Sequence, residues 1–350
     1  MELKLAFVGF GNVARAFARV LHDCRSQLAD EYDLSWKATA IATASHGCVT
    51  STKGIDLLKA AECVEHRSNL AELPETVSLT NSLAVIEACH ADILFETTPL
   101  NIIDGEPSVT HVRSALARGI NVVTANKGPL AFAYCELKSL AAKRGLSFRF
   151  EGTVMDGAPV FNLVEECLPG ARVIGFSGVL NSTTNLILTE MERGRSFEES
   201  LADARRLGIV EANADYDIDG WDAAMKAVAL ANVLMDANAS PADVIRKGIR
   251  QITNEELESA ARSGMAVRLI ARGKASDTGL RLNVSPEAVA VNSALGSARG
   301  TSSVLVLETD LMGQIAIVES NPGIKQTAYA LLSDMMKIGA ILTGSLELHS

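Results

Sequence analysis

The chain has 350 residues, of which 48% are hydrophobic and 21% are charged, so it can build substantial cores and is not expected to be disordered. A dinucleotide-binding fold alone takes roughly 130 to 150 residues, and we therefore expect two domains. The formal net charge of -10 at pH 7 repels a phosphate backbone, so we expect no nucleic-acid partner.

Signals for export, membrane insertion and zinc binding are missing from the sequence. The first residues, MELKLAFVGF, lead straight into a strand-like run, and no apolar stretch is long enough to cross a membrane. The cysteines show no CxxC spacing and the histidines show no HExxH spacing. We expect a cytoplasmic protein with reduced thiols, no membrane partner and no zinc-dependent hydrolysis.

The first 146 residues alternate strand-like and helical patterns, which predicts an α/β fold with a Rossmann-type, doubly wound parallel sheet. In chain order the segments are LKLAFVGF, NVARAFARVLHDC, KATAIATA, ADILFETT, SVTHVRSALARG, INVVTAN and LAFAYCELKSLAAKRG. The strand-like segments contain continuous apolar runs, as expected of parallel strands buried on both faces. We therefore predict an NAD(P)-binding domain over residues 1–146.

A glycine-rich turn follows the first predicted strand and opens an amphipathic helix. It reads GFGNVA, with Gly9 at the tight turn, Gly11 where a pyrophosphate approaches the backbone, and Ala14 where the helix packs closely. The helix N-terminus presents N–H groups to an anionic cofactor. These features predict a dinucleotide site at Gly9, Gly11, Asn12, Val13 and Ala14.

The end of the second predicted strand bears on the choice between NAD and NADP. Residues 41–47 read IATASHG and hold no Asp or Glu for the ribose hydroxyls of NAD. Ser45 and His46 are candidates to contact a 2′-phosphate, although no Arg accompanies them. The missing carboxylate favours NADP, or weak discrimination between NADP and NAD. For Ser45 and His46, an ordinary polar loop after a strand is an equally good interpretation.

Residues 147–320 change in pattern, which predicts a second, α+β domain. Strands are expected at RVIGFSGVL, SVLVLETD and GQIAIVES, and helices near residues 183–191, 196–207 and 221–235. The C-terminal segment 321–350 is expected to hold a helix from about residue 326 to 338. The sequence leaves open whether that helix packs back on the first domain.

Lys226 is the only charged residue in the helical segment AAMKAVAL, so its ammonium is expected to be partly desolvated or to reach a cleft. Hydride transfer to an aldehyde creates an alkoxide, which needs a proton donor, and a lysine serves in both directions. Helical spacing places Asp219, Asp222 and Lys226 on one face. A simple surface ion pair between Asp222 and Lys226 is the alternative interpretation.

Further acids, Glu211, Asp215 and Asp217, are expected on the loop that leads into this helix. Clustered carboxylates repel each other and need a cationic partner, and the α-ammonium of an amino-acid substrate is a suitable one. The acidic segment therefore predicts the charge of the substrate.

Lys127 follows the predicted strand NVVTAN and is expected at the carboxyl end of a parallel strand, where ligands bind. Lys127 could bind a substrate carboxylate or take part in a proton relay, and the alternative is that it is a solvated loop residue. Thr124 and Asn126 are residue types that favour turns and caps, as are the polar residues at 181–184, and we assign no catalytic role to Asn181–Thr184.

Together with the glycine-rich turn, four segments resemble the homoserine dehydrogenase family: FETTPLN, VVTANKGPLA, GVLNSTTNLIL and GIVEANADYDIDGWDAAMKAVALA. The resemblance implies a short form without a regulatory ACT domain. It also implies NAD(P)-dependent interconversion of L-homoserine and L-aspartate 4-semialdehyde, in threonine, methionine and isoleucine biosynthesis. A homodimer or higher homo-oligomer is implied, with the second domain supplying the interface.

The resemblance also implies roles for individual residues. Lys226, as proton donor, and Lys127 are the implied active-site lysines. The implied substrate-binding residues are Glu211, Asp217, Asp222 and Lys127. The implied cofactor-binding residues, beyond the glycine-rich turn, are Thr98, Pro99, Lys127, Gly208 and Gly323.

A monovalent cation such as Na+ is implied by the same resemblance. Its implied site is the loop matching Glu151, Val154, Asp156 and Ala158. Here Met155 and Asp156 replace small residues of the family, and PGIKQTA is a shortened form of the family's Gly-rich loop over the cofactor.

Two other functions are compatible with the sequence. One is a dehydrogenase of a different small amino or hydroxy acid, and the other is a dinucleotide-binding regulator without turnover.

Overall fold

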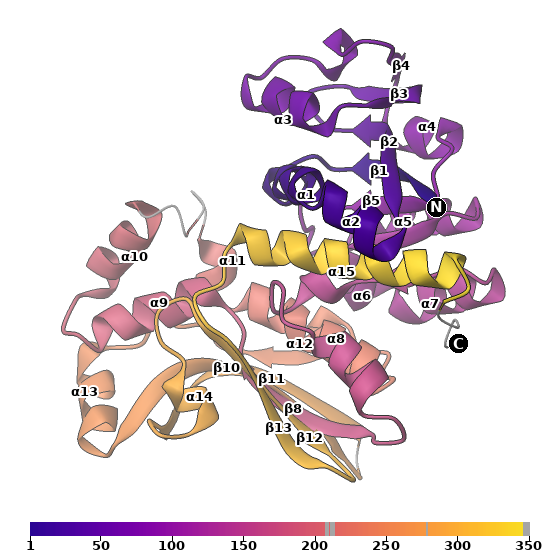
Figure 1. The fold of residues 1–350 in the computed structure, drawn as a ribbon. Coiled ribbons are helices and arrows are strands. Elements are labelled where there is room, and N and C mark those ends of the chain that lie inside the picture. Colours follow the sequence, from indigo (N-terminus) through magenta and orange to yellow (C-terminus); the bar gives the residue numbers. More distant parts are fainter. Residues whose placement is uncertain (207–209, 211–213, 278, 346–350) are drawn as a thin grey trace. The chain divides into compact units, whose positions relative to one another are not determined.

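The computed structural model describes residues 1–206, 210, 214–277 and 279–345. The chain divides into two compact units, Met1–Pro159 with Gly323–Ser350, and Val160–Pro322 (Figure 1). Among the described residues, none of the helices combines the length and the apolar character that a bilayer crossing requires.

The first unit is built on a seven-stranded sheet in the order β4-β3-β2-β1-β5-β6-β7. Its strands are β1 (Glu2–Val8), β2 (Ser35–Ala42), β3 (Cys48–Ile55), β4 (Val77–Leu79), β5 (Ile93–Glu96), β6 (Asn121–Thr124) and β7 (Phe148–Arg149). From β2 to β7 neighbouring strands run parallel, which confirms the predicted Rossmann-type sheet. The edge strands β3 and β4 run antiparallel, because the short turn after β2 leaves no room for a crossover helix.

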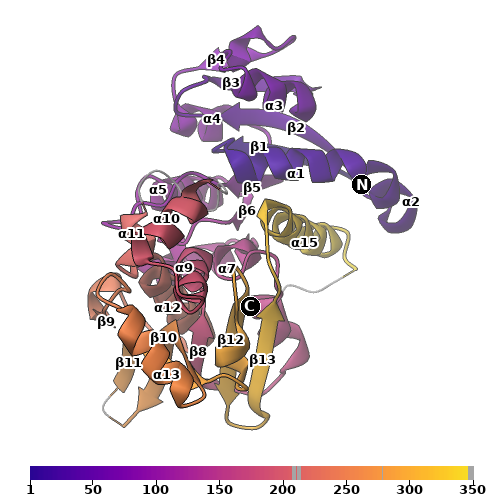
Figure 2. The same ribbon diagram turned by 90° about the vertical axis from the view of Figure 1, so that its left-hand side faces the viewer.

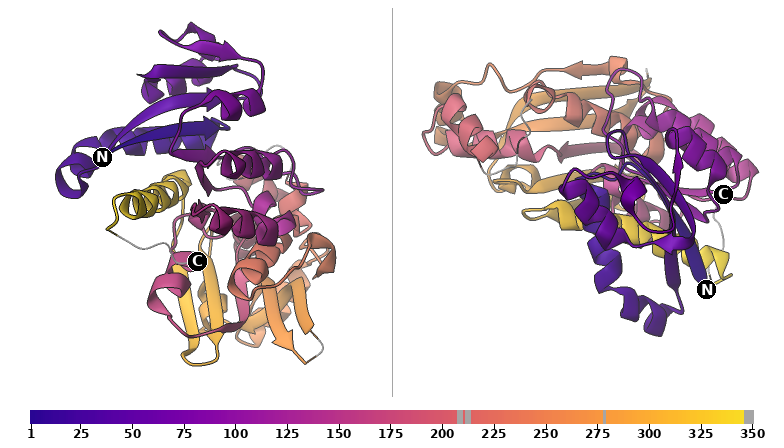
Figure 3. Two further views of the ribbon diagram at one scale, coloured as in Figure 1. Left: turned by 90° about the vertical axis from the view of Figure 1, so that its right-hand side faces the viewer. Right: turned by 90° about the horizontal axis from the view of Figure 1, so that it is seen from above.

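Helices pack on both faces of this sheet (Figure 3). The helical elements are α1 (Asn12–Asp23), α2 (Arg25–Tyr32), α3 (Leu57–Glu65), η1 (Leu70–Glu72), α4 (Ser82–Ala88), α5 (Ser108–Ala117), α6 (Gly128–Phe132) and α7 (Tyr134–Lys143). Alternate side chains of β1 enter different cores: Phe7 packs with Phe17 of α1, whereas Ala6 and Val8 share a core with Val112 of α5.

The C-terminal helix α15 (Ile324–Leu342) belongs to the first unit. Leu331 and Met335 join the core that holds Phe17, and the helix lies beside α1. This element is longer at both ends than the helix expected over residues 326–338. The apolar face of α15 is the reason for this packing, because an amphipathic helix is stable only when its apolar face is buried against another surface.

The first unit reaches Pro159, whereas the sequence places the domain boundary at residue 146. The difference has a local cause, because β7 adds to the sheet and the short helical turn η2 (Glu151–Thr153) packs against α15. The residues after β7 are therefore held by the first unit.

The second unit contains a six-stranded sheet in the order β13-β12-β8-β10-β11-β9 (Figure 2). Its strands are β8 (Val173–Val179), β9 (Val244–Arg246), β10 (Met265–Ser276), β11 (Gly279–Ala290), β12 (Ser303–Thr309) and β13 (Gly313–Glu319). Its helical elements are α8 (Val160–Asn162), η3 (Leu163–Cys167), α9 (Ser182–Met191), α10 (Phe197–Arg206), α11 (Asp215–Ile218), α12 (Trp221–Leu234), η4 (Pro241–Asp243), α13 (Asn254–Arg262) and α14 (Ala294–Ser297). The helices α9, α12 and α13 contact β10, and the long β10–β11 hairpin was not predicted from the sequence.

Candidate active site

The glycine-rich turn lies at the switch point of the first sheet, between β1 and β5. Connections leave these adjacent strands in opposite directions, which is where dinucleotides bind in such sheets. Gly9 has a φ of 86°, and a Cβ there would lie 2.6 Å from the backbone carbon of Thr97. The hydroxyl of Thr97 donates to the carbonyl of Gly9 at 2.8 Å. A side chain at residue 9 is therefore excluded by both conformation and space.

Gly11 and the start of α1 leave space for a ligand. Gly11 is the N-cap of the helix, and a Cβ built there meets no described atom within 4 Å. No side chain among the described residues caps this first turn. Asn12 is exposed and Val13 is half-buried, whereas Ala14 is fully buried in the core beneath them. The turn thus has the form that a pyrophosphate needs.

The turn after β2 is organised by its own polar groups. The hydroxyl of Thr43 donates to the carbonyl of Gly47 at 2.9 Å and accepts from the N–H of His46 at 2.8 Å. Ser45 is exposed, and its hydroxyl lies 2.9 Å from Nδ1 of His46. The described structure thus shows a polar turn that carries no carboxylate.

A buried polar network, here called the strand-end hub, joins the carboxyl ends of β5 and β6. It comprises Glu96, Thr98, His111, Thr124 and Asn126. The Glu96 carboxylate is fully buried and accepts from the N–H of Thr98 at 3.2 Å, from the Thr98 hydroxyl, and from the Thr124 hydroxyl at 3.2 Å. Nδ1 of His111 lies 3.6 Å from the same carboxylate.

Lys127 stands directly after the hub, as the N-cap of α6, and is half-buried. The amide of Asn126 donates to the carbonyl of Thr98 at 2.9 Å and its oxygen accepts from the N–H of Gly128 at 2.9 Å. The turn that carries Lys127 is therefore bonded to the turn that carries Thr98 and the exposed Pro99.

On the second unit, Lys226 lies on α12 and contacts a carboxylate and a backbone carbonyl. Its Nζ is 3.2 Å from Oδ2 of Asp222 and donates to the carbonyl of Leu180 at 2.5 Å. The side chains of Lys226 and Asp222 are 14% and 18% exposed, so they are neither a solvated surface pair nor sealed from a ligand. The ion pair between Asp222 and Lys226 that the sequence alternative expects is present, and it is partly buried.

Asn181, for which no catalytic role was predicted, bridges the carboxylates of Asp217 and Asp222 beside Lys226. Its Nδ2 donates to Asp217 at 2.8 Å and to Asp222 at 3.0 Å. Its oxygen accepts from the N–H of Thr184 at 2.8 Å and so caps α9. One side chain thus both starts a helix and bridges two carboxylates.

The pKa of Asp217 is raised above its ordinary value. Burial is the main cause, followed by the charge of Asp222, while hydrogen bonds from Thr183 and Asn181 and the charge of Lys226 act in the opposite direction. A cationic group of a ligand placed beside these two carboxylates would favour their ionised forms.

Two of the predicted acids do not belong to this cluster. Helix α11 ends at Ile218 and Gly220, at φ 80°, separates it from α12, so Asp219 does not share the helix face of Lys226. Arg250 binds Asp215 at 2.6 Å and Asp219 at 3.1 Å instead.

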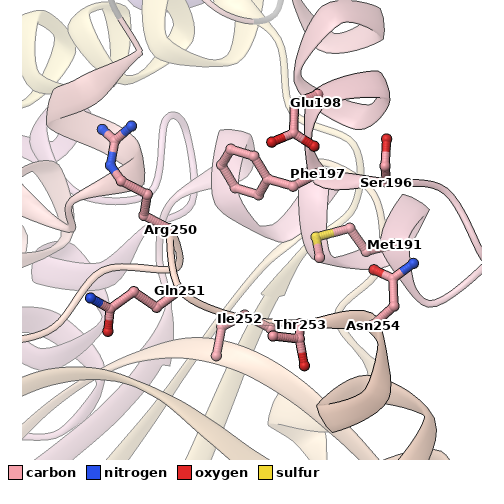
Figure 4. A pocket seen from close by; sticks show the side chains of 9 residues that line it. All are labelled: Met191, Ser196, Phe197, Glu198, Arg250, Gln251, Ile252, Thr253 and Asn254. Carbon is pink, nitrogen blue, oxygen red and sulfur yellow. The ribbon is translucent and has the colours of Figure 1, made fainter.

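Arg250 also lines a cavity of about 410 Å³ on the second unit. Figure 4 shows Met191, Phe197 and Arg250 among its lining residues. Lys226 and Asp222 are not among them, so this cavity is separate from the lysine cluster.

The loop proposed from the resemblance to hold a cation packs against α15. Val154 and Ala158 are buried, and the carboxylate of Asp156 accepts from the hydroxyl of Thr327 at 2.9 Å. Asp156 has a φ of 42°, in the left-handed region that Asp tolerates better than most residues. The loop is thus tied to the C-terminal helix.

Glu151 begins this loop and is buried. Its N–H donates to the carboxylate of Asp334 at 2.9 Å, and burial together with the charge of Glu151 raises the pKa of Asp334 to about 7. No group of three or more His, Cys, Asp or Glu side chains in metal-binding geometry occurs in the described parts of the chain.

Two further predicted site residues, Gly208 and Glu211, lie outside the described residues. Gly323 is the N-cap of α15, with its N–H donating to the side chain of Gln326 at 3.0 Å, and its backbone is extended. Its place in the structure is that of a helix start.

Family models match nearly the whole chain. The model described as "Homoserine dehydrogenase, NAD binding domain" matches residues 9–151, and the model described as "Homoserine dehydrogenase" matches residues 159–336. The first match begins directly after β1 and covers the rest of the Rossmann-type sheet, and the second covers the unit that carries Lys226 and continues into α15.

Curated relatives agree with this. A homoserine dehydrogenase of Methanocaldococcus jannaschii is 40% identical over 337 residues, which covers 96% of this chain and 98% of the relative. An NAD(+)-dependent homoserine dehydrogenase of Pseudomonas canavaninivorans is 37% identical over 339 residues, which covers 96% of each chain.

Solved structures show the same fold. A hyperthermophilic archaeal homoserine dehydrogenase in complex with NADPH has a TM-score of 0.82 and 26% identity, covering 97% of this chain and 98% of that chain. A homoserine dehydrogenase from Thiobacillus denitrificans has a TM-score of 0.83 and 25% identity, covering 98% of this chain and 74% of that chain.

The fold and the glycine-rich turn define an oxidoreductase with a Rossmann-type domain for a nicotinamide dinucleotide. Within that class, the chain belongs to the homoserine dehydrogenase family. The resemblance seen in the five sequence segments is thereby confirmed.

Proposed function

We propose that this chain interconverts L-homoserine and L-aspartate 4-semialdehyde, with Lys226 moving the proton. When the alcohol is oxidised, its carbon loses a hydride to the dinucleotide and its oxygen loses a proton to the neutral amine of Lys226. In the reverse direction the ammonium returns the proton to the oxygen. The observation that carries this proposal is the half-buried ammonium held by Leu180 and Asp222.

The dinucleotide is proposed to bind over Gly9 and Gly11, with its pyrophosphate at the first turn of α1 and its nicotinamide at Thr98 and Pro99. The open space above Gly11 supports this placement. The bound dinucleotide supplies the hydride acceptor or donor. The protein supplies position, since the turns at both strand ends are fixed by hydrogen bonds.

The substrate is proposed to be held by charge. Asp217 and Asp222, with Glu211, bind the α-ammonium, which relieves the repulsion between the bridged carboxylates. Lys127 binds the α-carboxylate from the turn beside Thr98. Binding groups of both charges favour an amino acid over an uncharged alcohol.

NADP is proposed as the preferred dinucleotide, with NAD also accepted. The turn after β2 supports this, because it carries the polar side chains of Ser45 and His46 and no carboxylate that would repel a 2′-phosphate. A lower KM for NADP than for NAD is the expected result. A lower KM for NAD would reverse the assignment.

The loop that includes Glu151, Val154, Asp156 and Ala158 is proposed to bind a monovalent cation such as Na+. The buried Glu151 and the tight packing of the loop support the proposal. Replacing sodium chloride by choline chloride at constant ionic strength should lower the rate. An unchanged rate would remove the cation from the account.

A cytoplasmic homodimer is proposed as the working form. Within the part of the chain that the structure describes, Cys24, Cys48, Cys63, Cys89 and Cys167 form no disulfide, as expected in a reducing compartment. Analytical ultracentrifugation should give twice the mass of the chain, and a monomer that turns over at the full rate would contradict the dimer.

The decisive experiment is a set of initial rates with L-homoserine and with other amino and hydroxy acids, using NADP and NAD in turn. Homoserine should support the highest kcat/KM. Preference for another substrate would favour a different dehydrogenase. Dinucleotide binding without turnover of any substrate would favour a regulatory protein.

A further inference from the structure

The strand-end hub contains a charge that the proposed chemistry does not use. Glu96 ends the apolar strand β5, and its side chain is fully buried, so it cannot touch a solvent-borne ligand directly. A buried carboxylate is costly unless it is fully hydrogen-bonded. A role for the buried Glu96 carboxylate is therefore sought in the residues that are hydrogen-bonded to it.

The partners of Glu96 come from both neighbouring strand ends. Thr98 donates twice, through its N–H at 3.2 Å and through its hydroxyl. The single hydroxyl proton of Thr124, at the end of β6, is shared between the Glu96 carbonyl at 3.0 Å and the Glu96 carboxylate at 3.2 Å. The carboxylate thus joins two turns that lie at the ligand-binding edge of the sheet.

The same network continues to Lys127. The Thr124 hydroxyl accepts from the N–H of Asn126 at 3.0 Å, and the Asn126 amide donates to Thr98 and to the carbonyl of Pro99 at 3.4 Å. Every one of these bonds lies next to the proposed nicotinamide edge or next to Lys127.

Helices α4 and α5 support the carboxylate from behind. Nε2 of the buried His111 lies 2.7 Å from the hydroxyl of Ser82, and its Nδ1 faces Glu96. The imidazole of His111 therefore connects Ser82 of α4 with the carboxylate of Glu96.

We propose that Glu96 is a positioning residue for dinucleotide binding, holding the Thr98–Pro99 turn and the Lys127 turn in one fixed arrangement. This inference rests on the proposed placement of the nicotinamide at Thr98 and Pro99. It assigns no contact between Glu96 and the ligand, and its effect passes through hydrogen bonds alone.

Thr124 offers the sharpest test, because it is fully buried and its side-chain bonds to the hub are made by its hydroxyl. Thr124→Val removes that hydroxyl, and Thr124→Ser keeps it. We expect Thr124→Val to weaken binding of the reduced dinucleotide about tenfold and to lower kcat, as for loss of a hydrogen bond to a charged group. Thr124→Ser should keep the native dissociation constant.

Glu96→Gln is the second variant. It keeps the size of the side chain but places an N–H donor where one carboxylate oxygen now accepts. The expected result is weaker dinucleotide binding of at least the size seen in Thr124→Val. If Glu96→Gln does not fold, the Thr124 pair decides the question alone.

Asn121→Ala is the matched control, at the opposite end of β6. Asn121 is also buried, and it also makes two hydrogen bonds, to Asp92 and from Ser147, each at 2.9 Å. It should lower the melting temperature but leave the dissociation constant and kcat unchanged.

The readout is fluorescence titration of the reduced dinucleotide without homoserine, together with kcat at saturation. The inference is overturned if Thr124→Val and Glu96→Gln bind the dinucleotide like the native enzyme and lose only thermal stability. Because binding is measured without homoserine, failure here is distinct from failure of the native enzyme to oxidise homoserine.

Discussion

Two polar clusters, one on each unit, differ in what surrounds their charges. In the strand-end hub the Glu96 carboxylate is fully buried, and hydroxyl and amide groups satisfy it. In the cluster around Lys226, an ammonium and two carboxylates remain partly exposed. A buried, satisfied charge can hold geometry but cannot exchange protons with a substrate, whereas a partly exposed pair can do so.

The comparison separates positioning from chemistry. Changes in the hub should alter dinucleotide binding, and changes in the Lys226 cluster should alter turnover and substrate binding. A hub variant that changes only dinucleotide binding would support this division of roles. A hub variant that changes substrate binding as strongly as dinucleotide binding would argue against it.

The largest effect is expected from Lys226→Ala. We expect kcat to fall at least about a hundredfold, as for loss of general acid-base help, with the dissociation constant of the dinucleotide unchanged. Steady-state kinetics and dinucleotide titration measure the two quantities. Lys247→Ala, at an exposed lysine of the same unit, is the control and should behave like the native enzyme.

A smaller effect is expected from Asn181→Ala. Loss of a donor shared by two carboxylates should raise KM for homoserine about tenfold. Asn181 also lowers the pKa of Asp217, so its removal raises that already raised pKa further. The ionised carboxylate of Asp217 binds the ammonium of the substrate. As the pH is lowered, kcat/KM should therefore begin to fall at a higher pH in Asn181→Ala than in the native enzyme.

The pH profile of kcat/KM checks this prediction. Asn185→Ala, one turn further along α9, removes a buried amide that donates to the carbonyl of Ser302 at 3.1 Å. That variant should lose stability and keep the native profile. An unshifted profile in Asn181→Ala would separate Asn181 from the ionisation of Asp217.

The two glycines of the turn should respond differently to alanine. A Cβ at Gly11 meets no described atom, so Gly11→Ala should fold normally and bind the dinucleotide about tenfold more weakly because a methyl group fills the pyrophosphate space. Gly9→Ala places a Cβ at positive φ against Thr97 and should lose about 2 kcal/mol of stability.

Denaturant unfolding and dinucleotide titration distinguish the two variants. Equal stability losses in Gly9→Ala and Gly11→Ala would show that the open space above Gly11 is filled in solution.

The smallest effect is expected from Thr327→Val, which removes the hydrogen bond to Asp156. The free energy of unfolding should fall by about 1 kcal/mol, as for one partly buried hydrogen bond. Denaturant unfolding measures it. Thr343→Val, at the exposed end of the same helix, should change stability less, and equal losses would mean that the Asp156 bond contributes little.

Local patterns carried the correct sequence predictions. The glycine-rich turn, the parallel strands and the Lys226–Asp222 pair depend on residues a few positions apart. Asn181 lies 36 and 41 residues from the acids it bridges, and its residue type is equally common at helix caps. Spacing within one element therefore could not reveal its second role.

Glu96 was missed for a related reason. Its only local signal is a carboxylate at the end of the apolar run ILFE, and its partner Thr124 is 28 residues away on another strand. Asp219 was misplaced because the left-handed Gly220 interrupts a helical spacing that otherwise continues.

Chemical rescue of Lys226→Ala tests the central claim most directly, because a small amine can occupy the volume that the substitution leaves. Methylamine should restore homoserine oxidation in proportion to the concentration of its free base, while leaving the native enzyme unaffected. A Lys226→Ala enzyme that runs at the native rate without any amine, or whose lost rate no amine restores, would contradict proton transfer by Lys226.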